Sequence, residues 1–216
     1  MENYFSQAGQ DKYIVNVLKK KTNGFFVEIG SNDAICGNNT YLLENKYKWT
    51  GIMVEFCGNF LEGYKTHRPK SVHVIDDATQ IDYMNLFETS NAPLSIDYLQ
   101  IDLDEGNGST LKTLQKFDET GGIFDNYKFA TITFEHDIYW SNAFNTREVS
   151  REIFTRRGYY RVFADVNIED VHPFEDWYVH SDLVDMNYIQ NLQEQNQKNY
   201  KEWNGIHTIN YASIQY

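Results

Sequence analysis

The sequence contains few of the residues that mark secreted or membrane-embedded proteins. Among 216 residues there are 2 cysteines and 3 prolines, and no apolar run approaches the roughly 20 residues that a membrane-spanning helix needs. Cys36 and Cys57 lack the spacing of metal ligands, which favours free thiols in a reducing compartment. The beginning of the chain, MENYFSQAGQDKY, is polar and contains acids, unlike a secretory signal. We therefore expect a cytoplasmic protein without a membrane partner.

Basic residues are also scarce. The chain has 19 Lys and Arg against 31 Asp and Glu, a net charge of −12. A field of this sign repels phosphate backbones and anionic lipid surfaces, so a nucleic-acid partner is not expected. The 41% of apolar residues and 16% of aromatics are typical of a globular protein that buries a sizeable core.

Apolar strands alternate with amphipathic helices along most of the chain. This alternation predicts an open, doubly wound α/β sheet of mostly parallel strands. We expect one domain, with an N-terminal helix in residues 1–23, a core in 24–185, and a C-terminal helix and tail in 186–216. The expected strands are 24–30, 50–56, 71–77, 95–104, 129–137, 159–166 and 176–184, and the expected helices are 7–20, 39–47, 59–67, 108–117, 145–158 and 186–203.

Several of the expected strands end in acidic residues. In open α/β sheets, ligands bind beyond the carboxyl ends of the strands. A ligand site is therefore expected where the polar residues of these ends meet: Glu28, Glu55, Asp76, Asp77, Asp102, Glu135 and His136.

The first strand lacks the phosphate-binding motifs of nucleotide enzymes. Ser31 and Asn32 follow Gly30 without a G-x-G-x-x-G fingerprint, and no G-x-x-x-x-G-K-[ST] loop exists. NAD and ATP are therefore weak candidates. S-adenosylmethionine suits an acidic edge better, because its ribose hydroxyls and adenine amine donate hydrogen bonds to carboxylates and its sulfonium is positive.

Four stretches follow one another in a specific order: SQAGQDKYIVNVL, GFFVEIGSNDAICGNNTYLLE, WTGIMVEF and HRP. Together they resemble the FkbM-type S-adenosylmethionine-dependent methyltransferases, whose pattern runs Ser-Gln…Asp, Phe-Val-Asp/Glu-Ile-Gly-Ala-Asn-Asp-Gly, Ser-Asn-Thr, Trp-x-Gly and Glu-Pro. YLQIDLDEGNGSTLKTL and FEDWYVH resemble later segments of that family. Two positions depart from the pattern: Ala34 replaces a glycine and Phe56 a proline. The resemblance implies a Rossmann-like class I methyltransferase with a seven-stranded sheet.

The resemblance also implies a role for each matching residue. Glu28 and the turn at residues 30–33 would surround the methionine part of the cofactor, and Glu55 would hold the ribose. Asp102 would lie near the transferred methyl group, and the N-terminal segment would form a lid. The implied cofactor-binding set is Gln7, Asp11, Glu28, Gly30, Ser31, Asn32, Asp33, Glu55, Asp76, Asp77, Ala78 and Asp102, with Asp76, Asp77 and Ala78 at the adenine.

A sugar hydroxyl needs a base or a metal before it can accept a methyl group. Asp102, Glu135 and His136 are the candidate catalytic residues, and the same three are candidate ligands of Mg²⁺ or Mn²⁺. Asp104 and Asp137, at the same two strand ends, could also supply the base or a metal ligand. His136 is alternatively a metal-free base or a hydrogen-bonded edge residue. Glu28 is alternatively a structural residue that orients the turn, and Trp140 or Trp177 a surface on which a sugar stacks.

The resemblance favours an O-methyltransferase that acts on a sugar, a glycan or another small hydroxyl-bearing acceptor. Three alternatives stay open: methylation of a small metabolite or a protein side chain, a non-catalytic module that only binds the cofactor, and an NAD-dependent sugar enzyme.

Overall fold

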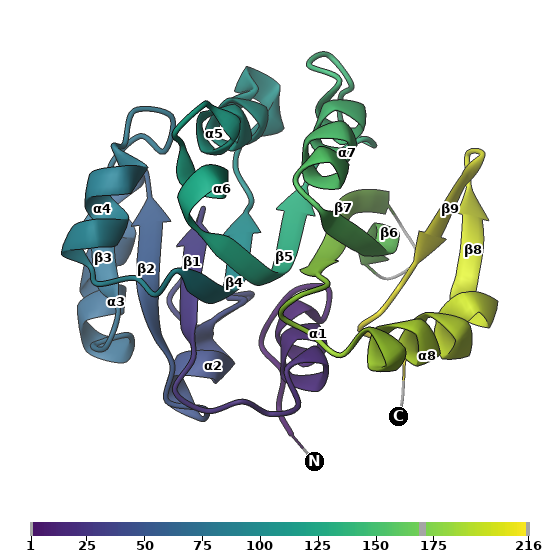
Figure 1. Cartoon of the computed structure of the whole chain (residues 1–216), viewed down its shortest axis with the longest axis horizontal. Coiled ribbons are helices and arrows are strands. Elements are labelled where there is room, and N and C mark those ends of the chain that lie inside the picture. The colour runs from purple at the N-terminus through teal and green to yellow at the C-terminus, as the bar shows by residue number, and fades with distance from the viewer. Residues whose placement is uncertain (1, 169–171, 215–216) are drawn as a thin grey trace.

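A mixed β-sheet runs through the computed structural model, which describes residues 2–168 and 172–214 (Figure 1). Within these residues the strand order is β3-β2-β1-β4-β5-β7-β6-β9-β8. Strands β1 to β5 are parallel, whereas β7 runs antiparallel to both β5 and β6. The predicted doubly wound, mostly parallel α/β fold is confirmed. The strands are β1 Phe25–Ile29, β2 Thr50–Glu55, β3 Val72–Ile75, β4 Ser95–Ile101, β5 Lys128–Glu135, β6 Tyr159–Ile168, β7 His172–His180, β8 Tyr200–Trp203 and β9 Ile206–Ile209.

The C-terminal segment differs from the predicted helix and tail. Helix α8, Met186–Asn196, ends in a short 3₁₀ turn, and the chain then forms the β8–β9 hairpin. Asn204 and Gly205 both have positive φ, 45° and 82°, as the two-residue loop of an Asn-Gly hairpin requires. Strand β9 joins the sheet beside β6, so the sheet has nine strands where the sequence predicted seven.

Helices cover both faces of the sheet and bury two apolar layers. Because β1 is covered on both sides, Phe26 packs into one layer and its neighbour Val27 into the other. One layer includes side chains from α1 Gln10–Val17, α2 Tyr41–Asn45, α3 Leu61–His67 and α8; the other includes side chains from α4 Tyr83–Thr89, α5 Ser109–Asp118, α6 Ile123–Asn126 and α7 Thr146–Arg156.

The N-terminal helix α1 is part of the core. Tyr13 is fully buried and its ring lies 4.6 Å from that of Trp177 on β7. Tyr211, after β9, completes this aromatic group at 4.9 Å from Trp177. Helix α1 therefore packs against the sheet instead of covering the cofactor as a lid.

The strand order reverses between β1 and β4, so the carboxyl ends of these strands and of β2 open onto a common edge.

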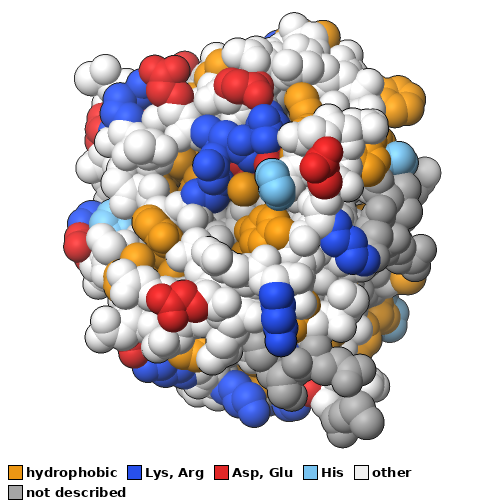
Figure 2. Space-filling view, turned by 90° about the vertical axis from the view of Figure 1, so that its right-hand side faces the viewer, with side chains coloured by type: hydrophobic (Ala, Val, Ile, Leu, Met, Phe, Trp, Pro, Cys, Tyr) orange, Lys and Arg blue, Asp and Glu red, His pale blue; other side chains and the backbone are white. Residues whose placement is uncertain are grey.

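On the side of the molecule at the right of Figure 1, Lys and Arg side chains gather close to Asp and Glu side chains (Figure 2). Among the described residues, no helix is both long and apolar enough to cross a bilayer.

Candidate functional site

A hollow of about 710 Å³ opens at the carboxyl ends of β1, β2 and β4. Its walls come from the turns that follow these strands, from the turn after β3 and from the start of α5. This is the edge at which the sequence predicted a ligand. The lining residues are Gly30, Asn32, Glu55, Phe56, Asp77, Ala78, Thr79, Asp102, Leu103, Asp104, Asn107, Ser109 and Lys112.

The first turn is built around Gly30, whose φ is 87°. A Cβ at this position would lie 1.7 Å from the carbonyl oxygen of Asp102, so the backbones of the β1 and β4 turns touch only because residue 30 is a glycine. Asn32 also has positive φ, at 50°. Its backbone N–H donates to Glu55 Oε2 at 2.8 Å, and the N–H of Cys57 donates to Oε1 at 2.8 Å. These two bonds fix the Glu55 carboxylate at the rim of the hollow.

The opposite end of the hollow holds Asp77, Ala78 and Phe56. Hydrogen bonds from Thr79 hold the pKa of Asp77 below its ordinary value of 3.8. Phe56 is 76% exposed beside Glu55 and offers an apolar surface there. Lys112 is the one basic side chain among the described lining residues.

Several residues predicted to touch the cofactor do not line this hollow. The buried Ser31 donates from its hydroxyl to the carbonyl oxygen of Glu28 at 3.2 Å. Asp33 accepts from the backbone N–H groups of Ile35 and Cys36 and so closes its own turn. Asp76 accepts from the N–H of Asp77, which leaves Asp77 as the acid at the hollow.

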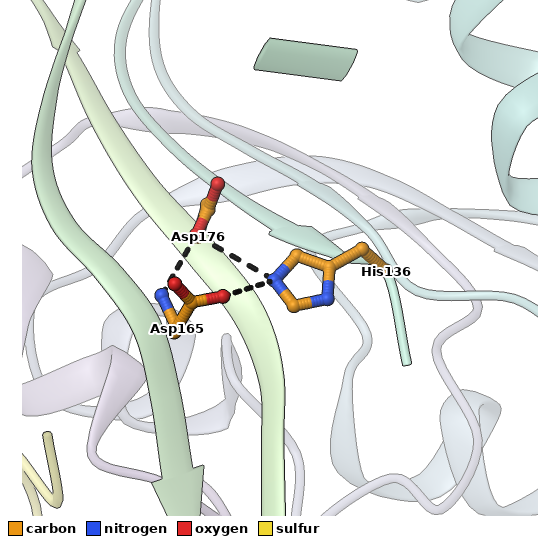
Figure 3. A group of neighbouring side chains, drawn as sticks. All are labelled: His136, Asp165 and Asp176. Atoms are coloured by element: carbon orange, nitrogen blue, oxygen red, sulfur yellow. Dashed lines mark hydrogen bonds and ion pairs between the residues drawn. The ribbon is translucent and has the colours of Figure 1, made fainter. Parts of the chain in front are cut away.

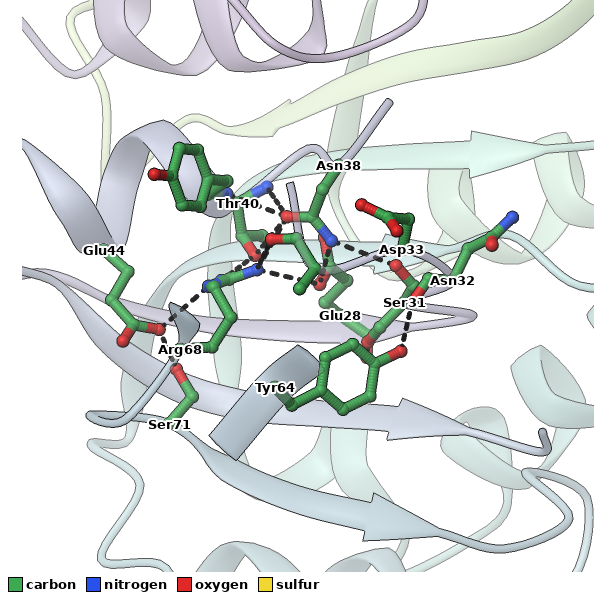
Figure 4. A network of polar contacts seen from close by, with 12 residues as sticks. Glu28, Ser31, Asn32, Asp33, Asn38, Thr40, Glu44, Tyr64, Arg68 and Ser71 are labelled. Atoms are coloured by element: carbon green, nitrogen blue, oxygen red, sulfur yellow. Dashed lines mark hydrogen bonds and ion pairs between the residues drawn. The ribbon is translucent and has the colours of Figure 1, made fainter. Parts of the chain in front are cut away.

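Glu28 belongs to a buried network below the first turn (Figure 4). It is 1% exposed, accepts from Asn38 Nδ2 at 3.2 Å, and lies 4.0 Å from Arg68. Arg68 is completely buried and donates to Glu44, Asn38 and Thr40. The structural reading of Glu28 therefore fits the geometry, and Arg68 positions the 30–40 loop from beneath.

The N-terminal residues have separate places. Asp11 is buried and accepts from the backbone N–H groups of Phe5 and Ser6, which fastens the segment before α1. Gln7 lies in that segment and lines a second, smaller hollow. Neither residue lines the larger hollow.

The second hollow has a volume of about 100 Å³. Glu135 and Asp137 contribute carboxyl groups to its wall, and the remaining lining residues are Gln7, Tyr139, Ile168, His172 and Phe174. Glu135 lies close enough to Asp102, which lines the larger hollow, for the two carboxyl groups to shift each other's pKa. This carboxyl pair therefore separates the two hollows.

Burial makes these carboxyl groups reluctant to ionise. Burial first, and then the charge and hydrogen bond of Asp102, raise the pKa of Glu135 well above its ordinary value. Burial also raises the pKa of Asp102 and raises that of Asp137 to about 6. Glu135 therefore ionises less readily than an ordinary carboxyl group.

His136 does not lie with Asp102 and Glu135. Consecutive residues of an extended chain point to opposite faces of a sheet, and His136 follows directly after Glu135 at the end of β5. Its Nε2 lies 3.5 Å from both Asp165 Oδ1 and Asp176 Oδ1, in a buried cluster (Figure 3). The predicted metal set of Asp102, Glu135 and His136 is therefore not assembled.

The His136 cluster is the one group among the described residues in which at least three His, Cys, Asp or Glu ligand atoms all lie within 4.8 Å of one another. Arginines of α7 already neutralise its acids. Arg147 donates to both oxygens of Asp165 at 2.7 Å, and Arg151 to both oxygens of Asp176 at 2.6 and 2.8 Å. A divalent cation would meet these guanidinium charges, so the cluster fits an ion network that docks α7 better than a metal site.

Sequence reasoning did not single out Phe56, Lys112, Tyr139 or the Asp165–Asp176 pair as site or network residues. Asp137, by contrast, was predicted with Glu135 and His136 as a residue that could supply a base or a metal ligand. The strand alternation that places His136 away from Glu135 was also available from the sequence.

Comparison with solved structures gives the class of this fold. A TehB-like SAM-dependent methyltransferase from Corynebacterium glutamicum matches 83% of this chain and 90% of its own, with a TM-score of 0.50 and 9% identity. A SAM-dependent O-methyltransferase from Thermotoga maritima matches 83% of this chain and 67% of its own, with a TM-score of 0.51 and 9% identity. Human methyltransferase-like protein 13, solved with SAH, matches 90% of this chain and 94% of its own, with a TM-score of 0.50 and 13% identity.

The chain therefore has the Rossmann-like fold of the SAM-dependent methyltransferases. No protein-family model and no curated protein matches it. The more particular assignment, to the FkbM type, stays a prediction from the motifs.

Proposed function

We propose that this protein is an S-adenosylmethionine-dependent methyltransferase that methylates a hydroxyl group of a sugar or a sugar-like acceptor. One observation carries the proposal: the ends of four parallel strands bring Gly30, Glu55, Ala78 and Asp102 to a single hollow of about 710 Å³, a size typical of cofactor sites. The fold shared with SAM-dependent methyltransferases supports the same conclusion.

The residues of the hollow suit the parts of this cofactor. The Glu55 carboxylate, which two backbone N–H groups hold in place, binds the ribose hydroxyls. Asp77 and Ala78 face the adenine, with Phe56 as an apolar neighbour. When bound, the cofactor supplies an electrophilic methyl group on a positively charged sulfur. Asp102 lines the larger hollow and lies next to Glu135, which lines the second, smaller hollow.

Proton removal from the acceptor then falls to the carboxyl pair Asp102 and Glu135 instead of His136. A carboxyl group with a raised pKa is a better base toward a hydroxyl than an ordinary one. The loop after β5 offers exposed rings, Tyr139 at 40% and Trp140 at 71% exposure, on which a sugar can stack. Trp177 is fully buried and is not such a surface.

Calorimetric titration with S-adenosylhomocysteine tests the proposal. Glu55→Gln removes two charge-assisted hydrogen bonds of at least ~1.5 kcal/mol each, so the Kd should rise about 100-fold. Glu62→Gln is the matched control, because that side chain is 82% exposed on α3. Mg²⁺ and Mn²⁺ should leave the Kd unchanged, since the predicted metal set is not assembled.

Methyl transfer to a glycan panel separates the remaining alternatives. Binding of the cofactor without transfer to any sugar, metabolite or protein would identify a binding module. If the wild-type protein fails to bind S-adenosylhomocysteine and is stabilised by NAD instead, the methyltransferase proposal is wrong.

A further inference from the structure

We infer that the methyl acceptor carries a positively charged amine, which the carboxyl groups of Asp102, Glu135 and Asp137 bind beside the cofactor hollow. This inference rests on the proposed function and names the class of its substrate.

Among the described residues, no Lys or Arg forms an ion pair with Asp102, Glu135 or Asp137, and His136 is the one basic side chain that lowers the pKa of any of the three, that of Asp137. The charges that act most strongly on Glu135 are those of Asp102, Asp137 and Glu175, all of them acids. Of the described residues that line either hollow, Lys112 is the one Lys or Arg, and it faces the adenine end, where its charge lowers the pKa of Asp77 after the hydrogen bonds of Thr79. A cationic ligand would supply the missing charge.

Unused hydrogen-bond acceptors point the same way. Gln100 is 3% exposed, and its Nε2 donates to Asp102 Oδ2 at 3.2 Å, so its side chain points at the carboxyl group. The Oε1 atom of the same amide is buried without a partner, and so is Oδ1 of Asp137. A buried acceptor without a donor destabilises a protein. An ammonium group brings three donors and no acceptor, which suits the unpaired Oδ1 of Asp137 at the wall of the smaller hollow.

The arrangement fits an ammonium ion better than a metal. A metal needs ligand atoms that converge on a point, and Asp102, Glu135 and Asp137 do not place three such atoms within 4.8 Å of one another. The smaller hollow, about 100 Å³, is well above the roughly 10–15 Å³ that a single buried water molecule needs. An ammonium group with one or two attached carbons fits this space.

The rim of the smaller hollow suits the body of an amino sugar. The ring of Tyr139 stacks on that of His172, with centroids 4.6 Å apart and planes at 8°. Trp140, 71% exposed, continues this surface along the chain. A sugar ring on the aromatic rim would hold its amine toward the acids and a hydroxyl toward the cofactor hollow.

The test uses the full chain saturated with S-adenosylhomocysteine. Binding of glucosamine and of glucose is measured by calorimetry at matched pH and ionic strength, and transfer of labelled methyl groups from S-adenosylmethionine to both sugars is measured in parallel. We expect the amine to bind and to react at least 10-fold better than the parent sugar, as a charge-assisted hydrogen bond predicts.

Two variants locate the amine. Asp137→Asn keeps the shape of the side chain, and asparagine tolerates the φ of 43° at this position. In calorimetry, Asp137→Asn and Glu135→Gln should each reduce the binding preference for glucosamine over glucose about 10-fold or more while S-adenosylhomocysteine binds as before. Methyl transfer is compared only in Asp137→Asn, because Glu135 belongs to the proposed base. Glu119→Gln removes the same charge at an exposed site, next to a different hollow, and should change neither.

The outcomes are distinct. Equal affinity for glucosamine and glucose in the wild-type protein would refute the inference and leave the proposed function intact. If both carboxyl variants bind S-adenosylhomocysteine equally more weakly than the wild type, the acids hold the cofactor's own amino group. This outcome would also refute the inference. Absence of S-adenosylhomocysteine binding in the wild-type protein would overturn the proposed function, and the inference with it.

Discussion

Asp176→Asn tests whether the cluster around His136 stabilises the fold as an ion network. The carboxylate accepts from Arg151 at 2.6 and 2.8 Å, from the backbone N–H of Asp165 at 2.8 Å and from the hydroxyl of Tyr178 at 3.0 Å. All four partners are donors, so an amide nitrogen in place of one oxygen would face donors. Arg151 would also lose the charge of its main partner, although it keeps Asp165 at 3.0 Å.

Removal of one partner from a buried ion pair destabilises a protein by about 3–5 kcal/mol. For a chain of this size each kcal/mol lowers the Tm by about 2–4 °C, so the variant should melt about 6–20 °C below the wild type. Calorimetry and urea unfolding measure the change. Asp182→Asn is the matched control, because Asp182 and its partner Lys128 have side chains 61% and 52% exposed, and its Tm should not move.

The pH dependence of this stabilisation has a definite sign. Burial alone would raise the pKa of Asp176, but the hydrogen bonds and the charge of Arg151 outweigh burial and hold the pKa well below its ordinary value of 3.8. A depressed native pKa stabilises the fold above the ordinary value and less so as the pH falls below it. The gap between wild type and Asp176→Asn should therefore narrow below about pH 4. A gap that is absent at pH 7, or a saturable rise in Tm with Mn²⁺ that the substitution abolishes, would refute the ion-network interpretation.

Two further substitutions test the first turn at the larger hollow and the buried network beneath that turn. Gly30→Ala places a Cβ 1.7 Å from the Asp102 carbonyl oxygen and should lower the Tm and abolish S-adenosylhomocysteine binding in calorimetry. Gly37→Ala shares the positive φ but has no atom within 4 Å of the new Cβ, so equal effects of the two would contradict the close-contact argument. Arg68→Met removes a fully buried cation and should destabilise the protein by about 3 kcal/mol in urea unfolding. The control Arg156→Met, at a side chain that is 54% exposed, should have little effect, and a similar small loss in both would show that Arg68 does not support the 30–40 loop.

The sequence predicts the sheet well, because its strands are apolar runs that end in polar turns. FFVEI and TGIMVE are buried on both faces, which produces a continuous pattern instead of an alternating one. The short helices α4 and α6 were missed. The hairpin after Trp203 did have a signal, the Asn-Gly pair at 204–205.

The candidate site, too, could be predicted from the sequence only in part. Glu55, Asp77 and Asp102 follow strand ends, and the common direction of parallel strands brings them to one hollow. The burial of Glu28 beneath that hollow depends on Arg68, 40 residues further on, and a pairing across that distance leaves no mark in a local pattern. The place of His136 follows from the partners that β6 and β7 supply, Asp165 and Asp176, which are far from β5 in the sequence.

The end of strand β5 places a carboxyl group and an imidazole on opposite faces of the sheet, because neighbouring residues of a strand point in opposite directions. Glu135 points to the smaller hollow, and His136 points to the cluster of Asp165 and Asp176 that the arginines of α7 contact. Loss or gain of one residue within 128–134 would exchange the two, since a one-residue slip turns every side chain of a strand to the other face. On the proposed function, a histidine would then face the acceptor and an extra acid would be buried beneath α7, so the length of this strand is as much a part of the candidate site as any residue in it.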